Sequence, residues 1–523
     1  MTLPAVNRAL VVLVLITTLG AVLIFANLGD RYLWDDEAET ALLAQRVLRF
    51  GVPIAWDGRD LISQRCGTDY DANYLWRETP WLQFYVTALS FKLFGAGTLT
   101  ARLFFGVLGV LSILSLYVLG VALFRDRALA LLATAFLTLS VPFLLHVRQA
   151  RYYAIAALAT IWAIYFFFQL IRNRRGALLG LVLAMTVLFH SNYLAGFATA
   201  AGLGLALIAF PFDRRATLRL AGAAVATLVI NLPWLAMFDM RGKADYAATG
   251  LSVQSYATKT WVYLFRIELY VCSFVLLAAL IAVRFLVIRR KPERAASWPE
   301  PRVCVALALF TLGHVLVLAA GPYFWFRYVV GLFPVFALLQ AVVIRALWPV
   351  NRLAAVAACA LALFVDRADL VRGRLGSPPV KYVDEITHHV PGPIAGIVSH
   401  LHAYARPGDR VFMSYGDLPI RFYTGLEVRG GLGCQGFAGW PPADWIIDRH
   451  FRFDPNGPGS APGWAEDAER MSSYLRRVPV GDYWGVRISE IDTVWENLPE
   501  PPLHRYRAPA EGPRLVIYRR HVR

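Results

Sequence analysis

The sequence has little charge and few cysteines, and several catalytic motifs are absent from it. Only 17% of the 523 residues are charged, whereas 57% are hydrophobic. The five cysteines are scattered without metal-ligand spacing, so no zinc motif is present. No P-loop, glycine-rich dinucleotide fingerprint or nucleophile elbow stands at a fitting place. Without a nucleotide site, the energy for any group transfer has to come from the substrate itself, as in a donor activated by a lipid phosphate.

Apolar sequence is abundant instead, and it comes in runs of about twenty residues that can each cross a hydrocarbon core. The formal net charge of +16 sits in short basic clusters between these runs. Such clusters are typical of the cytoplasmic loops of membrane proteins and argue against a nucleic-acid partner. The composition therefore predicts a polytopic membrane protein.

About eleven membrane spans can be drawn, starting from a cytoplasmic N-terminus and leaving the C-terminus outside. Residues 11–28 are too long for a signal-peptide core and lack a convincing cleavage site, so we interpret them as a retained first helix. The predicted membrane domain covers residues 1–369. Its spans lie at 10–28, 100–123, 128–146, 153–171, 177–190, 193–211, 217–238, 262–288, 303–320, 327–347 and 353–368.

Two regions are predicted to lie outside the membrane, on its external side. In the loop 29–99, helical spacing over 38–50 predicts a short helix that lies on the membrane surface. The segment WLQFYVTALSFKLFG predicts another interfacial helix or a re-entrant one. A true span in that segment would invert the later topology, which the basic clusters argue against. Residues 370–523 predict a small α/β domain, in which VFMSYGDLPIRFYTG is typical of strand, turn and helix. Cys66 and Cys434 both fall outside, where a disulfide and two free thiols remain alternatives.

An acidic cluster follows the first span directly. It consists of Asp35, Asp36, Glu37 and Glu39. A solvated acidic helix start is the simpler interpretation, because carboxylates favour the first turn of a helix. At a membrane surface, however, crowding and lost hydration raise carboxylate pKa values, which suits a general base.

The external side has few basic residues, and the arginines that do lie there form a counterpart to the acidic cluster. Arg148 and Arg151 stand in HVRQARYY beside Tyr152, and Arg327 stands in GPYFWFRYVVGLFP. Each can be an ordinary interfacial anchor, but arginine is also the preferred clamp for a phosphate group.

Other polar residues near the predicted spans are weaker candidates. His190, Asn192 and Tyr193 in LFHSNYLAG are explained most simply by a polar turn, with substrate binding as the alternative. Glu268 and His314 fall inside predicted spans, where ionisable groups are functional candidates, but they stand alone.

Three stretches together resemble the membrane-embedded GT-C glycosyltransferases, specifically the bacterial relatives of protein O-mannosyltransferases and of the lipid A aminoarabinose transferase. They are WDDEAETALLAQRVLRFG, ETPWLQFYVTALSFKLFGAGTLTARL and FRYVVGLFPVFALL. The C-terminal stretches YGDLPIRFYTGLEVRGG and VWENLPEPPLHRY are similar to the external domain of related bacterial members. The resemblance covers nearly the whole chain.

The resemblance implies a transferase of the bacterial inner membrane that takes a sugar from a polyprenyl-phosphate carrier on the external face. The family's catalytic aspartate corresponds to Asp36, and Asp35 is an extra acid that can share the role. Glu78 in Glu-Thr-Pro stands where the family commonly has Lys-Pro-Pro. This departure leaves donor recognition open, and it leaves open whether a divalent metal takes part; no other cofactor is implied.

The mechanism that follows is an inverting transfer to an acceptor hydroxyl, with Asp36 as the base and the arginines stabilising the carrier phosphate. Glu37, Glu78, Tyr152, His190, Asn192 and Tyr193 are further candidates for substrate binding. The acceptor, whether lipid, glycan or protein, does not follow from the residues. Two alternatives are a lipid or sugar transporter and a non-catalytic envelope scaffold. A transporter would favour internal repeats and broken mid-membrane helices, and no repeat is evident.

Overall fold

The computed structural model describes residues 5–211, 213–291, 298–322, 324–449, 464–492, 498–507, 509 and 511–521. The chain divides into two compact units. We call the first the helical unit; it comprises Met1–Ala26, Phe105–Ile386 and Pro499–Pro501. We call the second the mixed unit; it comprises Asn27–Phe104, Thr387–Leu498 and Pro502–Arg523. The predicted domain boundary between 369 and 370 rests on membrane topology and stays a prediction.

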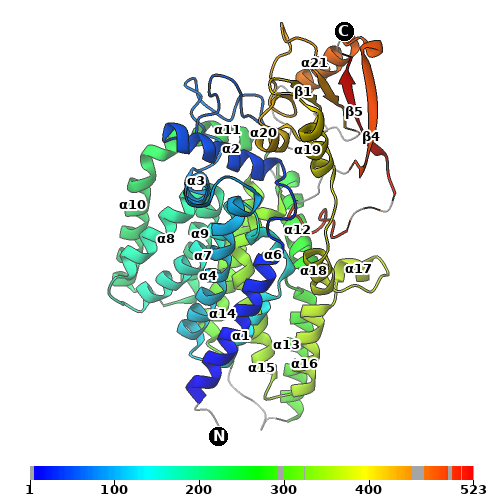
Figure 1. Ribbon diagram of the computed structural model, residues 1–523. Coiled ribbons are helices and arrows are strands. Elements are labelled where there is room, and N and C mark those ends of the chain that lie inside the picture. Colours follow the sequence, from blue (N-terminus) through cyan, green and yellow to red (C-terminus); the bar gives the residue numbers. More distant parts are fainter. Residues whose placement is uncertain are drawn as a thin grey trace. The chain divides into compact units, whose positions relative to one another are not determined.

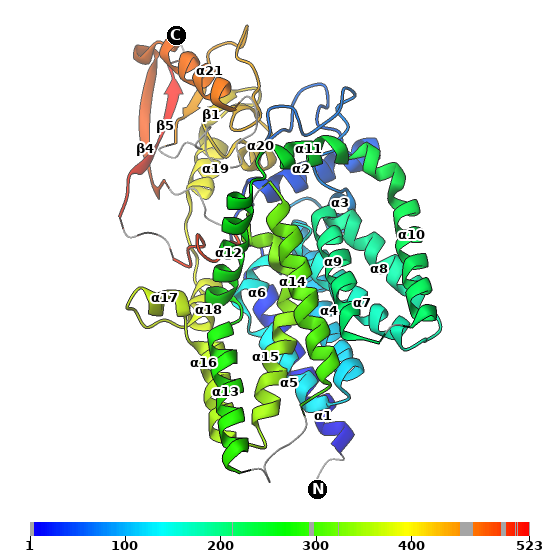
Figure 2. The same ribbon diagram turned by 180° about the vertical axis from the view of Figure 1, so that it is seen from behind.

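The helical unit is built almost entirely from helices (Figures 1 and 2), most of which are apolar in sequence. They are α1 (Ala5–Phe25), most of α4 (Thr98–Phe124), α5 (Arg127–Thr138), α6 (Val141–Val147), α7 (Tyr153–Ile171), α8 (Ala177–Ser191), α9 (Tyr193–Ala206), η1 (Leu207–Ala209), α10 (Arg214–Met237), α11 (Met240–Thr249), α12 (Val253–Tyr270), α13 (Phe274–Arg290), α14 (Pro301–Ala320), η3 (Phe326–Leu332), α15 (Phe333–Leu347), α16 (Arg352–Phe364), α17 (Arg367–Val371) and α18 (Pro378–Thr387).

Helix length and composition support a polytopic membrane fold. Among the described residues, six helical segments are long and apolar enough to cross a membrane, or eight if two bent pairs each count as one span. Each of the predicted spans coincides with an apolar helix or a bent pair. Three of them correspond only to shorter apolar helices, at Ala177–Ser191, Tyr193–Ala209 and Arg352–Phe364. The count of eleven therefore stays a prediction.

The spans predicted at 128–146 and 262–288 are each broken rather than continuous. Helices α5 and α6 meet at a bend of 64°, and α12 and α13 meet at a bend of 68°. At the second break, Glu268 accepts hydrogen bonds from the Ser273 hydroxyl (2.6 Å) and from the Phe274 backbone N–H. The carboxylate thus satisfies donors at the start of α13, and we assign Glu268 to this turn.

Close packing in the helical unit depends on small residues where α9 meets α14. A Cβ atom at Gly202 would lie 2.7 Å from the Phe310 carbonyl oxygen, and one at Gly313 would lie 3.0 Å from the Ala201 carbonyl oxygen. The glycines let the two backbones approach each other, as small residues commonly do between membrane helices.

The mixed unit combines helices with a five-stranded sheet of order β2-β1-β3-β5-β4. Its elements are α2 (Asp35–Phe50), α3 (Leu82–Phe94), the first residues of α4, α19 (Pro393–Tyr404), β1 (Arg410–Met413), α20 (Asp417–Thr424), β2 (Glu427–Gly430), β3 (Trp445–Ile447), α21 (Trp464–Arg477), η4 (Val480–Asp482), β4 (Tyr483–Ile491) and β5 (Arg514–Arg520). Strand β1 pairs in parallel with β2 and β3, whereas β5 pairs antiparallel with β3 and β4.

Helices cover both faces of this sheet, because side chains alternate along its strands. Val411 and Met413 of β1 pack with α19 and α20 in one apolar core. Phe412, between them in sequence, packs with residues of α21 in a second core on the opposite face. The predicted strand, turn and helix of VFMSYGDLPIRFYTG are present as β1 and α20.

Helix α2 begins just after Trp34, ahead of the helical spacing predicted over 38–50, and ends at Gly51. The carboxylates of its first turn suit the positive end of the helix dipole. At the other end, Gly51 has a φ of 81°, and its N–H donates to the Val47 carbonyl at 2.8 Å. Glycine adopts this left-handed conformation without steric cost.

Candidate active site

The four acids at the start of α2 have different environments, although they are close in sequence. Asp35, Glu37 and Glu39 are buried, with exposed fractions of 9%, 0% and 5%. Asp36 is only partly buried. Of the four, Asp36 is therefore the carboxylate that a substrate can reach most easily.

Glu37 is held in a buried ion pair with Arg102 of α4, within the mixed unit. Arg102 Nε and Nη2 donate to the two Glu37 carboxylate oxygens at 2.8 and 2.6 Å. Arg102 Nη1 also donates to the carbonyls of Leu28 and Arg31, at 2.9 and 2.8 Å. The bidentate pair fixes the start of α2, which is a structural role for a residue that the sequence offered as a substrate contact.

Asp35 faces groups from the C-terminal part of the mixed unit. Burial is the main cause that raises the pKa of its carboxyl to about 8, and the charges of Asp417 and Asp36 contribute to the same rise. A hydrogen bond with Tyr415 and the charge of Arg449 act in the opposite direction. At neutral pH this carboxyl is therefore mostly protonated, which separates its role from that of Asp36.

The partners of Asp35 come from residues that follow β1 and β3. Asp417 is buried at the first position of α20, where burial raises the pKa of its carboxyl to about 6 while Arg421 opposes the rise. Arg421 Nη2 lies 3.4 Å from Asp417 Oδ2. Arg449, after β3, forms a buried ion pair with Asp492 at 2.8 Å. Sequence reasoning did not assign these residues a role.

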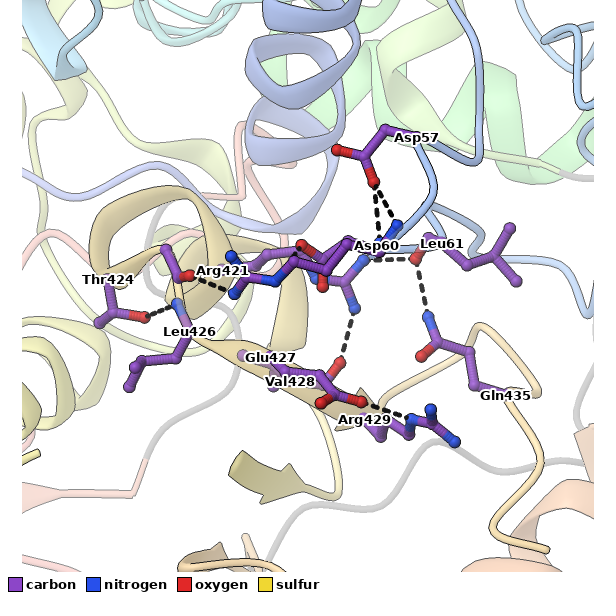
Figure 3. Close-up of polar contacts among 12 residues, drawn as sticks. Asp57, Asp60, Leu61, Arg421, Thr424, Leu426, Glu427, Val428, Arg429 and Gln435 are labelled. Atoms are coloured by element: carbon purple, nitrogen blue, oxygen red, sulfur yellow. Dashed lines mark hydrogen bonds and ion pairs between the residues drawn. The ribbon is translucent and has the colours of Figure 1, made fainter. Parts of the chain in front are cut away.

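The loop that follows α2 is attached to the C-terminal part of the same unit by polar contacts (Figure 3). Arg421 donates to the carbonyl oxygens of Leu61 in the loop and Val428 in β2, the latter at 2.7 Å. Gln435 Nε2 also donates to the Leu61 carbonyl, at 2.7 Å. A disulfide joins Cys66 to Cys434, which resolves the alternatives left open by the sequence.

Glu78, the acid that departs from the family's Lys-Pro-Pro, forms an ion pair with Arg65 of the same loop. Both side chains are mostly buried. Nearby, burial raises the pKa of Asp69 to about 6, with Glu78 as the second cause. The acid at position 78 is thus integrated into the fold of the loop.

The arginine candidates all lie in the helical unit. Arg148 Nη1 donates to the carbonyls of Leu23 and Ile24 at the end of α1, at 3.0 and 2.9 Å. Arg151 and Arg327 are both close enough to the Tyr152 hydroxyl to interact with it electrostatically. The structure thus brings Arg151, Tyr152 and Arg327 together.

Arg327 stands on a short helical turn, η3, that a buried carboxylate holds in place. Glu500 accepts hydrogen bonds from the backbone N–H groups of Phe326 (2.9 Å) and Arg327 (3.0 Å). Burial raises the pKa of Glu500, and the positive charge of Arg327 opposes this. Glu500 belongs to the stretch VWENLPEPPLHRY. Its contact with Arg327 could not be predicted from the sequence, because 173 residues separate the two.

The polar turn predicted around residues 190–193 is confirmed. Asn192 caps α9 by accepting a hydrogen bond from the Ala195 N–H at 2.9 Å. The His190 ring packs edge-on against Trp234, and Lys243 Nζ lies 5.9 Å from the centre of the Tyr193 ring. His314 is fully buried in α14. The contacts of Asn192 are those of a structural cap. Substrate binding by His190 and Tyr193 stays a prediction.

Within the part of the chain that the structure describes, no group of three or more His, Cys, Asp or Glu side chains is arranged to hold a metal ion.

Comparisons with known proteins define the class of fold. A sequence profile described as dolichyl-phosphate-mannose-protein mannosyltransferase matches residues 78–237. A crystal structure of ArnT from Cupriavidus metallidurans bound to undecaprenyl phosphate is similar over 97% of both chains, with a TM-score of 0.56 and 17% identity. The apo state of ArnT gives a TM-score of 0.57 over 98% of both chains, with 15% identity. No curated protein matches by sequence.

The archaeal oligosaccharyltransferase AglB from Archaeoglobus fulgidus, in complex with an inhibitory peptide and a dolichol-phosphate, is also similar. Its TM-score is 0.51 at 13% identity, over 84% of this chain and 69% of that chain. The chain therefore has the fold of the GT-C membrane glycosyltransferases, as the sequence predicted. At these identities the likeness to solved structures establishes the fold.

Proposed function

We propose that this chain is a glycosyltransferase of the bacterial inner membrane that moves a sugar from a polyprenyl-phosphate carrier to an acceptor hydroxyl on the external face. The fold supports this proposal, and so does the mannosyltransferase profile over residues 78–237. The solved structures of ArnT and AglB contain undecaprenyl phosphate and dolichol-phosphate, respectively. A carrier of the same chemical kind is the donor we propose here.

The observation that carries the proposal is the position of Asp36. It stands in the first turn of α2, shortly after the apolar helix α1, and it is partly accessible among three buried acids. A general base has to reach the proton that it removes and has to be ionised when it does so. Among the four acids, Asp36 meets the requirement for access best.

The proposed reaction is an in-line displacement. The acceptor oxygen attacks the anomeric carbon while its proton passes to the Asp36 carboxylate. The bond between the anomeric carbon and the carrier phosphate oxygen breaks, and the phosphate leaves with the electron pair. Attack from the face opposite the leaving group inverts the anomeric configuration.

The leaving phosphate needs stabilisation of its negative charge, and Arg327 and Arg151 are the residues we assign to this task. Their common neighbour, Tyr152, adds a hydroxyl donor. Arg148 is a weaker candidate for contacting the phosphate than Arg151 and Arg327, because its guanidinium already donates to two carbonyls at the end of α1.

An in vitro transfer assay tests the proposal. The donor is the carrier-linked sugar pool extracted from a strain that lacks the gene, and the acceptor is supplied by membranes of that strain. Purified wild-type protein should release polyprenyl phosphate, whereas Asp36→Asn should be slower by about 10²–10⁴-fold. Glu466→Gln, an exposed carboxylate in α21, is the matched control and should keep the wild-type rate. If Asp36→Asn and Asp35→Asn both turn over at the wild-type rate, the assignment of the base is wrong.

A further inference from the structure

The sheet of the mixed unit has a topological switch point between β1 and β3. The two strands are parallel neighbours. The chain leaves β1 through α20, which packs on one face of the sheet, and leaves β3 toward α21, which packs on the other face. In open α/β sheets, the crevice at the carboxyl ends of such diverging strands is where ligands bind.

Polar residues follow the carboxyl ends of both strands. Tyr415 and Asp417 follow β1, and Arg449 follows β3. The Arg449 N–H donates to Ser414 Oγ at 2.8 Å, which ties the two strand ends together. Two left-handed glycines shape the turn around Asp417, because a Cβ at Gly431 would overlap Asp417 Oδ1 and one at Gly416 would lie 3.3 Å from Arg449 Nη1.

Asp35, at the start of α2, faces these residues and is buried among them. Its carboxyl has a hydrogen bond with Tyr415 and interacts electrostatically with Asp417 and Arg449. Its Oδ1 atom is buried and has no hydrogen-bond partner among the described residues. A buried carboxyl with an unsatisfied oxygen is costly as an anion, whereas the neutral form avoids most of that cost.

We propose that Asp417 and Tyr415 are positioning residues that make the crevice at β1 and β3 part of the active site. Asp417 holds Asp35 as a neutral carboxyl beside Asp36, and Tyr415 fixes the orientation of that carboxyl through its hydrogen bond. The proposal rests on the proposed function for its catalytic meaning. A neutral Asp35 removes one of two adjacent negative charges, so the proton of the acceptor goes to Asp36. It also supplies an O–H donor next to the base.

The charged groups around Asp35 act in opposite directions. Asp36 on the same helix and Asp417 on the facing turn disfavour its ionisation, whereas Tyr415 and Arg449 favour it. Arg421 is the counter-charge of Asp417, and the charge of Asp417 in turn helps to raise the pKa of Asp467 on α21. The pKa of Asp417, about 6, lies below that of Asp35, about 8, so Asp417 carries its charge first as pH rises.

The test is a pH titration of the full-length protein in lipid nanodiscs. The infrared band of protonated carboxyl groups is measured at each pH and reports the protonation of Asp35. Asp35→Asn identifies the band that belongs to Asp35. Asp417→Asn should lower the midpoint of that band by about one pH unit or more, because a like charge is removed. Tyr415→Phe should raise the midpoint, because the ionised carboxylate loses a donor. Glu466→Gln and Tyr404→Phe, both exposed, are matched controls that should leave it unchanged.

Shifts in opposite directions would support the proposal, because a general loosening of the fold would move both variants the same way. An Asp35 band that titrates in the ordinary range of aspartate, or that neither variant moves, would overturn it. Tyr415→Phe preserves the ring, so the test stands even if Asp417→Asn fails to fold. Opposite shifts combined with full turnover by Asp36→Asn would support the positioning of Asp35 and refute the proposed base.

Discussion

At the scale of single residues, sequence neighbours in α2 differ because each meets a different partner. Glu37 is paired with an arginine, Asp35 is buried beside another aspartate, and Asp36 keeps partial access to solvent. A helix turns by about 100° per residue, so consecutive side chains point in different directions. This geometry converts one acidic run into separate structural and chemical roles.

Asp35 should make the stability of the protein depend on pH. Its pKa is 3.8 in the unfolded chain and about 8 in the folded one, so the folded state binds the proton more tightly. The stability that this proton contributes is complete below about pH 4 and is lost as pH rises toward about 8. Asp35→Asn cannot lose this proton, so the variant escapes the loss of stability. The melting temperature of the variant minus that of the wild type should therefore increase from pH 5 to pH 8.5. A difference that stays constant over this range would contradict the buried, protonated state.

The ion pair between Glu37 and Arg102 should be important for stability. Glu37→Gln leaves Arg102 buried without its counter-charge, which typically costs about 3–5 kcal/mol. The double variant Glu37→Gln/Arg102→Met should be less destabilised than the sum of its single changes. Arg476→Gln breaks an exposed pair with Glu469 and serves as the control, with little expected effect on stability because solvent screens exposed pairs. Thermal unfolding of the purified proteins measures the stability of the two single variants, the double variant and the control. If the effects of the two single changes add up to that of the double variant, the pair does not stabilise the fold.

At the scale of elements, the turn η3 depends on Glu500. Replacing this carboxylate with Gln removes a charged acceptor that serves the N–H groups of Phe326 and Arg327. Hydrogen bonds to charged groups contribute about 1.5–3 kcal/mol, so exchange of these two amides should become about ten-fold faster or more. Hydrogen exchange measured by mass spectrometry tests this, with the exposed Glu511→Gln as control. Unchanged protection of η3 would show that other contacts hold it.

The elements themselves could largely be predicted from the sequence, because they depend on local patterns. Apolar runs locate the helices, and the short apolar strand followed by turn residues locates β1 and α20. The breaks in two spans were missed, because hydropathy does not register the capping of a turn by Glu268 or a bend between two apolar helices.

The partners in the site could not be predicted, because they are far apart in the chain. Glu37 and Arg102 are 65 residues apart, and Arg327 and Glu500 are 173 apart. Long-range pairs of this kind are specified by the folded topology, and a single sequence gives no signal for them. The stretch YGDLP was recognisable as a strand-to-helix turn, but only the sheet order shows that its turn lies at a switch point.

At the scale of the whole molecule, the disulfide gives a readout of the proposed external location. Cys66 and Cys434 are 368 residues apart in sequence, so the bridge closes a long loop of the unfolded chain. Losing such a bridge typically costs about 2–5 kcal/mol. Cys434→Ser should therefore lower the melting temperature under non-reducing conditions, while Cys359→Ser, outside the bridge, is the control. If protein isolated without reductant has both thiols open to alkylation, the oxidising location of the mixed unit is contradicted.

The central claim is that Asp36 removes a proton from an acceptor during transfer of a carrier-linked sugar. The most direct measurement is mass spectrometry of envelope lipids and glycans from a deletion strain, complemented separately with wild-type protein, Asp36→Asn and Glu466→Gln. We expect one polyprenyl-phosphate sugar to accumulate and to be cleared by wild type and Glu466→Gln but not by Asp36→Asn. The glycan that returns with clearance would identify the acceptor. An unchanged carrier pool in the deletion strain, or full clearance by Asp36→Asn, would contradict the account.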